Sequence, residues 1–204
     1  MSKTLLIIAH TPSPNTAALA KAGLDACLSY DGYDHGAVKT RCVSPFNVTS
    51  PDLLAADAVI IGTTENIGYM AGATKDMFDR CYNDWLDYSD AKPVAIYIRA
   101  GLDGTATKRA LTSICGGLKW RQVAEPLILH GDWSDEFCEQ VSDLCLGVAV
   151  GLDAGIFEAD GCAHDSYASC FSAYPLNARQ MIARKVNARK AFSNLRGVWQ
   201  DRSI

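Results

Sequence analysis

Five short apolar runs alternate with stretches of helical period over the first three quarters of the chain. The runs occupy residues 3–9, 37–43, 57–62, 93–98 and 126–130. The clearest, Leu5-Leu6-Ile7-Ile8, is continuous rather than alternating, which is typical of a parallel strand buried on both faces. Strands that alternate with helices favour right-handed strand–helix–strand units. The pattern therefore predicts an α/β three-layer sandwich, in which helices cover both faces of a five-stranded parallel sheet.

The helices are predicted from apolar positions three and four residues apart. They cover residues 15–28, 50–54, 72–86, 104–115 and 135–152. Asn15 belongs to a residue type that often caps helices, so it is the expected N-cap of the first helix. Pro51 opens the short second helix, at a position that proline favours.

The pattern breaks after Phe157. Residues 158–176 have no clear period, and residues 177–199 predict a basic amphipathic helix. Its apolar side is marked by Met181, Ile182, Val186, Phe192, Leu195 and Trp199. We therefore expect a domain over 1–157 and a C-terminal extension over 158–204. Three roles of the extension stay open: packing on its own domain, exchange between the subunits of a homodimer, or contact with an anionic surface.

The distribution of charge supports the division into a domain and an extension. The net charge of the chain is −4. Residues 158–204 contain seven Lys/Arg and four Asp/Glu, whereas residues 1–157 contain twelve Lys/Arg and nineteen Asp/Glu. An acidic body does not suggest nucleic acid as a partner. No apolar run approaches the ~20 residues that span a bilayer, so a membrane is not expected either.

The eight cysteines and the N-terminus indicate a cytoplasmic protein. No two cysteines have the C-x-x-C spacing, and Cys27, Cys138 and Cys145 lie inside apolar helical runs, so we expect reduced, buried thiols. The apolar core of the N-terminus, Leu5 to Ala9, is shorter than that of a secretory signal peptide. Cys162, His164, Asp165 and Cys170 are metal-ligand types, but their spacing fits no common zinc pattern, and no metal is expected.

Three loops carry candidate chemistry. The first, after the first strand, holds Thr11, Ser13, Asn15 and Thr16 and no acidic side chain. It opens onto a helix N-terminus, where free N–H groups and the helix dipole attract phosphate. An ordinary capped loop explains the same residues equally well. The G-x-x-x-x-G-K-S/T and G-x-G-x-x-G motifs are absent, which argues against an NTPase and a dinucleotide-binding Rossmann site.

The second and third loops offer an apolar cover and flexible backbone. In Thr63–Gly72, the pair Tyr69-Met70 stands between polar residues, where it would suit a flat aromatic ring, although a long surface turn is the alternative. In the loop after the fourth strand, Gly101 and Gly104 permit close approach of the backbone. Arg99 would either face a ligand oxygen or form a salt bridge with Glu65 or Asp103.

One ligand would touch all three loops if the sheet has the flavodoxin-like order 2-1-3-4-5, because strands one, three and four are then neighbours. Its phosphate would lie at the first loop and its ring between the other two. We therefore expect a flat ring with one phosphate.

Two segments, Ser13-Pro14-Asn15-Thr16-Ala17-Ala18-Leu19-Ala20 and Gly62 to Arg80, resemble the flavodoxin-like NADPH-dependent FMN reductase family. The second is similar to the family's G-T-P-E-N-x-G-x-x-x-G-A-x-K-x-x-x-D segment, with Thr64 in place of proline. The resemblance implies that FMN phosphate is bound by Thr11, Ser13, Asn15, Thr16 and Ala17. It implies ring contacts from Thr64, Glu65, Asn66, Ile67, Gly68, Tyr69 and Met70, and from Arg99, Gly101, Leu102 and Gly104.

Three functions compete. The first is an oxidoreductase that passes electrons from NAD(P)H through FMN to a small acceptor such as a quinone or flavin. The second is a flavodoxin-type electron carrier without enzymatic activity. The third is an interaction domain that has lost FMN. No catalytic dyad stands out, as expected where a cofactor carries the chemistry.

Overall fold

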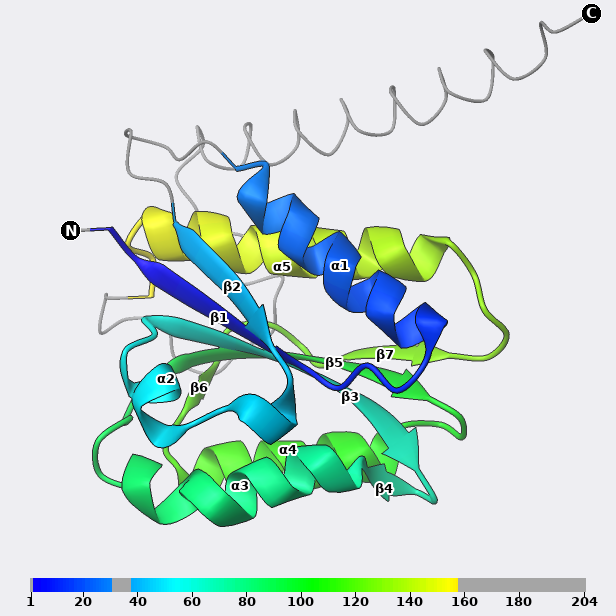
Figure 1. Cartoon of the computed structure of the whole chain (residues 1–204), viewed down its shortest axis with the longest axis horizontal. Helices are drawn as coiled ribbons and strands as arrows, with labels where there is room; N and C mark the ends of the chain where they lie inside the picture. Colours follow the sequence, from blue (N-terminus) through cyan, green and yellow to red (C-terminus); the bar gives the residue numbers. More distant parts are fainter. Residues whose placement is uncertain (1, 31–37, 158–204) are drawn as a thin grey trace, which may run out of the picture.

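A sheet of seven strands forms the centre of the computed structural model, which describes residues 2–30 and 38–157 (Figure 1). The strands are β1 Thr4–Ala9, β2 Lys39–Val43, β3 Ala58–Asn66, β4 Tyr69–Met70, β5 Pro93–Ala100, β6 Arg121–Gln122 and β7 Leu127–His130. Their order is β2-β1-β3-β5-β6, with β7 also paired to β5 and β4 paired to β3. Only the β3–β4 pair is antiparallel.

The prediction of five strands is therefore wrong, and the two additional strands have different causes. The fifth position of the sheet is divided: β6 pairs with β5 at Pro93 and Val94, and β7 pairs with it from Tyr97 to Ala100. The other extra strand, β4, comes from a hairpin at the end of β3. Both β4 and β6 have two residues, too few to show a period in the sequence.

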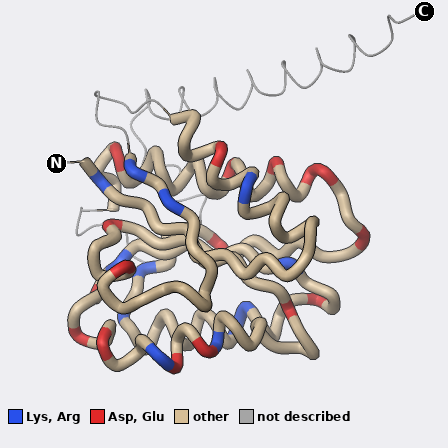
Figure 2. The backbone as a smooth tube through the Cα atoms, viewed as in Figure 1, with Lys and Arg blue, Asp and Glu red and all other residues tan. Residues whose placement is uncertain are grey.

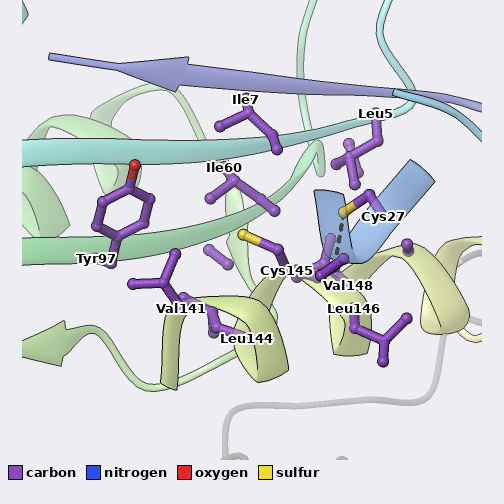
Figure 3. Close-up of a cluster of buried hydrophobic side chains, with 14 of the residues drawn as sticks. Leu5, Ile7, Cys27, Ile60, Tyr97, Val141, Leu144, Cys145, Leu146 and Val148 are labelled. Carbon is purple, nitrogen blue, oxygen red and sulfur yellow. Dashed lines mark hydrogen bonds between the residues drawn. The ribbon is translucent and has the colours of Figure 1, made fainter. Parts of the chain in front are cut away.

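Helices cover both faces of the sheet, as predicted for a three-layer sandwich (Figure 1). They are α1 Pro14–Leu28, α2 Ser50–Leu54, α3 Gly72–Trp85, α4 Thr105–Gly117 and α5 Glu136–Asp153, with a 3-10 turn, η1, at Pro45–Asn47. On β1, Leu5 and Ile7 pack in the core under α1 and α5, and Leu6 and Ile8 pack in the core of α3 and α4. Figure 3 shows the first of these cores.

The N-cap of α1 is Ser13, so the prediction of Asn15 is wrong. Ser13 has an extended backbone, and its hydroxyl accepts a hydrogen bond from the N–H of Thr16 at 3.3 Å. The Thr16 hydroxyl accepts one from the N–H of Ser13 at 3.0 Å, which completes a capping box. Pro14 decides the position, because its fixed φ suits the first helical residue and places the cap one residue earlier.

The cysteines in residues 2–30 and 38–157 are free thiols. Burial is confirmed for Cys27, Cys81, Cys115 and Cys145, whereas the prediction is wrong for Cys42 and Cys138, which are half-buried. Burial raises the pKa of Cys115 to about 12, so this thiol stays protonated at neutral pH. Within the same residues, no helix is both long and apolar enough to cross a membrane.

Several predictions fall outside the described residues. They are the extension 158–204 with its helix at 177–199, the first residue of the strand at 37–43, and the group around Cys162 and Cys170.

Candidate functional site

The carboxyl ends of β1, β3 and β5 meet at one edge of the sheet (Figure 1). Ala9 pairs with Gly62, and Thr64 pairs with Arg99, so the segments that leave these three strands start side by side. The N–H of His10 also donates to the carbonyl of Gly62 at 2.9 Å. The prediction that the first, third and fourth predicted strands are neighbours is confirmed, and the three candidate loops begin at one place.

The first loop presents polar groups at the N-terminus of α1. Thr11, Ser13 and Asn15 are exposed, whereas Thr16 is buried. The hydroxyls of Ser13 and Thr16 serve the capping box, and the side chains of Thr11 and Asn15 make no hydrogen bond with the described part of the chain. The first turn of α1 contains no acidic side chain, so nothing there opposes an anion.

The second loop is a β-hairpin, so the prediction that residues 63–72 form a loop is wrong. β3 continues to Asn66, and Ile67 and Gly68 turn the chain with φ of 52° and 70° before β4. Positive φ at both central residues is the mark of a type I′ turn, which matches the twist of a hairpin. Thr63 and Thr74 share a hydrogen bond at 2.8 Å between their hydroxyls, which fixes the hairpin to α3.

The hairpin separates the pair Tyr69-Met70. Met70 is 2% exposed and packs in the core of α3 and α4, whereas Tyr69 is 42% exposed. Residues on a strand alternate between its two sides, and this explains the difference. Tyr69 and the fully exposed Ile67 are therefore the apolar side chains that the hairpin offers to a ligand.

Glu65 connects the hairpin to the third loop. Its carboxylate accepts a hydrogen bond from the N–H of Leu102 at 2.6 Å, and the residue is 8% exposed. Sequence reasoning missed this connection. The available signal was an acidic residue directly after a buried strand, where burial requires a hydrogen-bond partner.

The third loop has a constrained end and an open side. Gly104 has φ 74°, and a Cβ on it would lie 2.6 Å from Ile128, so the loop needs glycine there. A Cβ on Gly101 would meet nothing within 4 Å, and Leu102 is 62% exposed. Asp103 accepts a hydrogen bond from the N–H of Thr105 at 2.9 Å and so opens α4.

Arg99 forms neither of the predicted salt bridges. Its guanidinium donates to the carbonyls of Ala100 at 2.6 Å, Leu129 at 2.9 Å and Gly131 at 2.5 Å. It also lies 5.3 Å from the ring centroid of Phe137 on α5. These contacts hold the charge at the end of β7, where the guanidinium joins β5, β7 and α5.

Replacing Arg99 with methionine should therefore reduce stability rather than ligand binding. Methionine keeps much of the apolar stem but loses three charge-assisted hydrogen bonds, so we expect a loss of about 2 kcal/mol in the free energy of unfolding. Urea unfolding of the variant measures this. The control is Arg109→Met on α4, an exposed position where little change is expected. An unchanged unfolding midpoint for the Arg99 variant would show that these bonds contribute nothing.

One residue near this edge was not predicted. Phe46, in η1, is 64% exposed, and its ring centroid lies 6.2 Å from that of His10. Phe46, Ile67, Tyr69 and Leu102 are four of the seven large exposed hydrophobic side chains in residues 2–30 and 38–157. Such a concentration of exposed apolar groups indicates a binding surface. Burial lowers the pKa of His10.

The architecture is that of proteins with known structures. A flavodoxin from the domain Archaea superimposes with a TM-score of 0.59 at 16% identity, covering 72% of this chain and 96% of that one. The fold is flavodoxin-like. A flavodoxin, WrbA-like protein from Agrobacterium tumefaciens gives 0.57 at 14% identity, covering 76% and 98%. An oxidoreductase from Corynebacterium diphtheriae gives 0.54 at 17% identity, covering 78% and 99%.

Comparisons of sequence find no relative: neither a family model nor a curated protein matches the chain.

Proposed function

We propose that this chain binds FMN at the carboxyl edge of its sheet and passes electrons from NAD(P)H to a small acceptor, such as a quinone or a flavin. The observation that carries the proposal is the convergence of three segments at that edge: exposed donors at the N-terminus of α1, a hairpin with exposed apolar side chains, and a loop bonded to that hairpin through Glu65. Ligands of open α/β sheets bind at such an edge. Flavodoxins and an oxidoreductase among the proteins of this fold support the proposal.

The residues fit a phosphomonoester at the first loop. Thr11 and Asn15 would donate to it from their side chains, and the helix dipole of α1 would favour its charge. Pro14 has no N–H, so side chains have to supply more of the hydrogen bonds than in a glycine-rich loop. Ser13 and Thr16 act mainly by holding the loop in position through the capping box.

The residues also fit a flat ring at the second and third segments. Tyr69 and Leu102 would cover it, and Gly68 and Gly101 leave open space in which the backbone can approach. FMN, when bound, supplies the hydride and electron chemistry itself. The role of the chain is to orient the ring and to exclude water from it.

Absorption and turnover measurements test the proposal directly. Purified protein should show the visible bands of a flavin, or bind added FMN with quenching of its fluorescence, and it should oxidise NAD(P)H when a quinone is added. A protein that neither contains nor binds FMN would contradict the proposal and would support the interaction domain.

The electron carrier remains the second candidate because of one observation. Residues 122–157 contain seven acidic residues and no Lys or Arg, and Asp132 and Asp135 in this segment follow β7 at the same edge as the proposed ring site. An acidic surface beside a redox centre suits docking of a basic protein. If the bound FMN is reduced and reoxidised by a protein partner while NAD(P)H stays unoxidised, the electron carrier becomes the better account of the function.

Glu65 gives a test of the ring site. Glu65→Leu removes the acceptor of the Leu102 N–H and frees the third loop, so FMN affinity should fall roughly tenfold, the effect of losing about 1.4 kcal/mol. Glu65→Gln is the matched control, because its amide oxygen can accept the same hydrogen bond. Fluorescence titration with FMN measures both. Equal affinities of the two variants would mean that the hydrogen bond does not organise the ring site.

A further inference from the structure

The C-terminal half of α5 is buried on every side, although α5 belongs to an outer layer. In its first half, Glu136, Glu139, Gln140 and Asp143 are exposed at helical spacing. From Leu144 to Leu152, all residues are buried. Nine residues make two and a half turns, so every direction around the helix is represented. By contrast, α1 in the same layer keeps exposed residues up to Leu28, its last residue.

Leu146 marks the covered outer side. It is 3% exposed, and Figure 3 shows it pointing away from the strands, whereas Val148 points toward them. Val150 follows one helical turn after Leu146, on the same side, and is 4% exposed. The side toward α1 is covered by contacts with that helix: the Cys27 thiol donates to the carbonyl of Cys145 at 3.4 Å, and Ser142 donates to that of Ala22 at 3.1 Å.

The sequence of this half requires a cover. Residues 144–152 read LCLGVAVGL, which is hydrophobic all round and typical of a helix enclosed by protein. Among the described elements, α1 lies beside α5 and the sheet lies beneath it (Figure 1). The outer side of this half, around Val150, faces away from α1 and the sheet, and its apolar side chains are stabilised where a further segment of protein packs on them.

We propose that residues 177–199 of the same chain bind along the outer side of α5 as an amphipathic helix. The connection to this segment starts near one end of the surface, because Phe157 lies only four residues after the last residue of α5. The connection at 158–176 can reach up to ~60 Å when extended, more than twice the ~27 Å length of α5. The segment therefore reaches any part of the helix without strain.

The segment 177–199 complements α5 in two ways, through its apolar stripe and through its charge. Met181, Phe192, Leu195 and Trp199 fall within about 60° of one another on a helix of 3.6 residues per turn, and so form one apolar stripe. Its basic residues are Arg179, Arg184, Lys185, Arg189, Lys190 and Arg196. The acidic residues of α5, with no Lys or Arg between residues 122 and 157, provide their counterpart (Figure 2).

Photo-crosslinking in the full-length chain tests the occupant. Benzoylphenylalanine at Glu139, an exposed position on the same side of α5 as Leu146 and Val150, should crosslink to peptides from residues 177–199 within single chains. The matched control is the same amino acid at Arg109, exposed on α4 across the sheet, which should give no such product. Crosslinks that join two chains would overturn the proposal in favour of a homodimer, and the absence of any product with 177–199 would overturn it as well.

Hydrogen exchange provides a second measurement on folded, full-length protein. The double variant Leu195→Asp/Trp199→Asp places charges in the apolar stripe, so the amides of 144–152 should exchange at least about tenfold faster, while those of β1 stay protected. Asn194→Asp, a polar position about 100° from the nearest residue of the stripe, is the control and should leave α5 unchanged. Unchanged exchange of 144–152 in the double variant, or equal acceleration by the control, would overturn the proposal.

Discussion

Gly62→Ala should destabilise the protein by about 3 kcal/mol, at the upper end for overpacked core positions. A Cβ on Gly62 would lie 2.1 Å from Cζ and 2.2 Å from Oη of Tyr97, its partner on β5. Tyr97 has little room to move because it is 3% exposed and packs under α5 (Figure 3). The carbonyl of Gly62 also accepts the hydrogen bond from His10, so the edge that carries the candidate site should be disturbed. Urea unfolding measures the loss.

A double-mutant cycle isolates the cause of this loss. In a Tyr97→Val background the ring atoms are gone, so adding Gly62→Ala should cost less than about 0.5 kcal/mol, and the two positions should show a coupling of several kcal/mol. Gly116→Ala is the control, because a Cβ there meets nothing within 4 Å, and alanine favours a helix. The same loss in both backgrounds would show that contact with Tyr97 is not the reason for glycine at position 62.

The main elements were predictable because their signals are long. Leu5 to Ile8 and the strands of 57–62 and 93–98 are apolar over several residues, and burial on both faces explains why they lack alternation. The hairpin was missed because β3 continues through Thr63, Thr64 and Glu65, which are polar but buried. The hydrogen bond between Thr63 and Thr74, and the one that Leu102 donates to Glu65, join segments that are distant in sequence. The local pattern therefore did not reveal that these polar groups would have partners.

The candidate site was predictable in position but not in detail. Parallel strands place their carboxyl ends at one edge of the sheet, so the three segments start side by side whichever way their side chains point. The direction of each side chain depends on tertiary contacts. Arg99 turns to the carbonyls of Leu129 and Gly131, and Met70 turns into the core, whereas Tyr69 and Leu102 remain exposed. The order of the strands therefore indicates where the candidate site lies, whereas tertiary contacts decide which of its side chains stay exposed.

Asn15→Asp should weaken FMN binding about 100-fold while it stabilises the protein without FMN. At the second position of α1, a carboxylate would repel the phosphate at short range, and a 100-fold loss corresponds to about 2.8 kcal/mol. The same carboxylate interacts favourably with the N-terminus of α1, which has no acidic residue in its first turn, so the apo protein should gain about 0.5 kcal/mol. Fluorescence titration and urea unfolding measure the two effects.

The opposite signs of these effects make the test specific, because a general disturbance of the fold would lower both stability and affinity. Asn83→Asp is the control: the residue is exposed near the C-terminal end of α3, far from the edge where α1 begins, and the same change in charge should leave FMN affinity unchanged. Salt should partly restore binding by Asn15→Asp, since screening weakens the repulsion between carboxylate and phosphate. If the Asn15→Asp protein is stabilised yet binds FMN as tightly as the original, the phosphate does not bind at the N-terminus of α1.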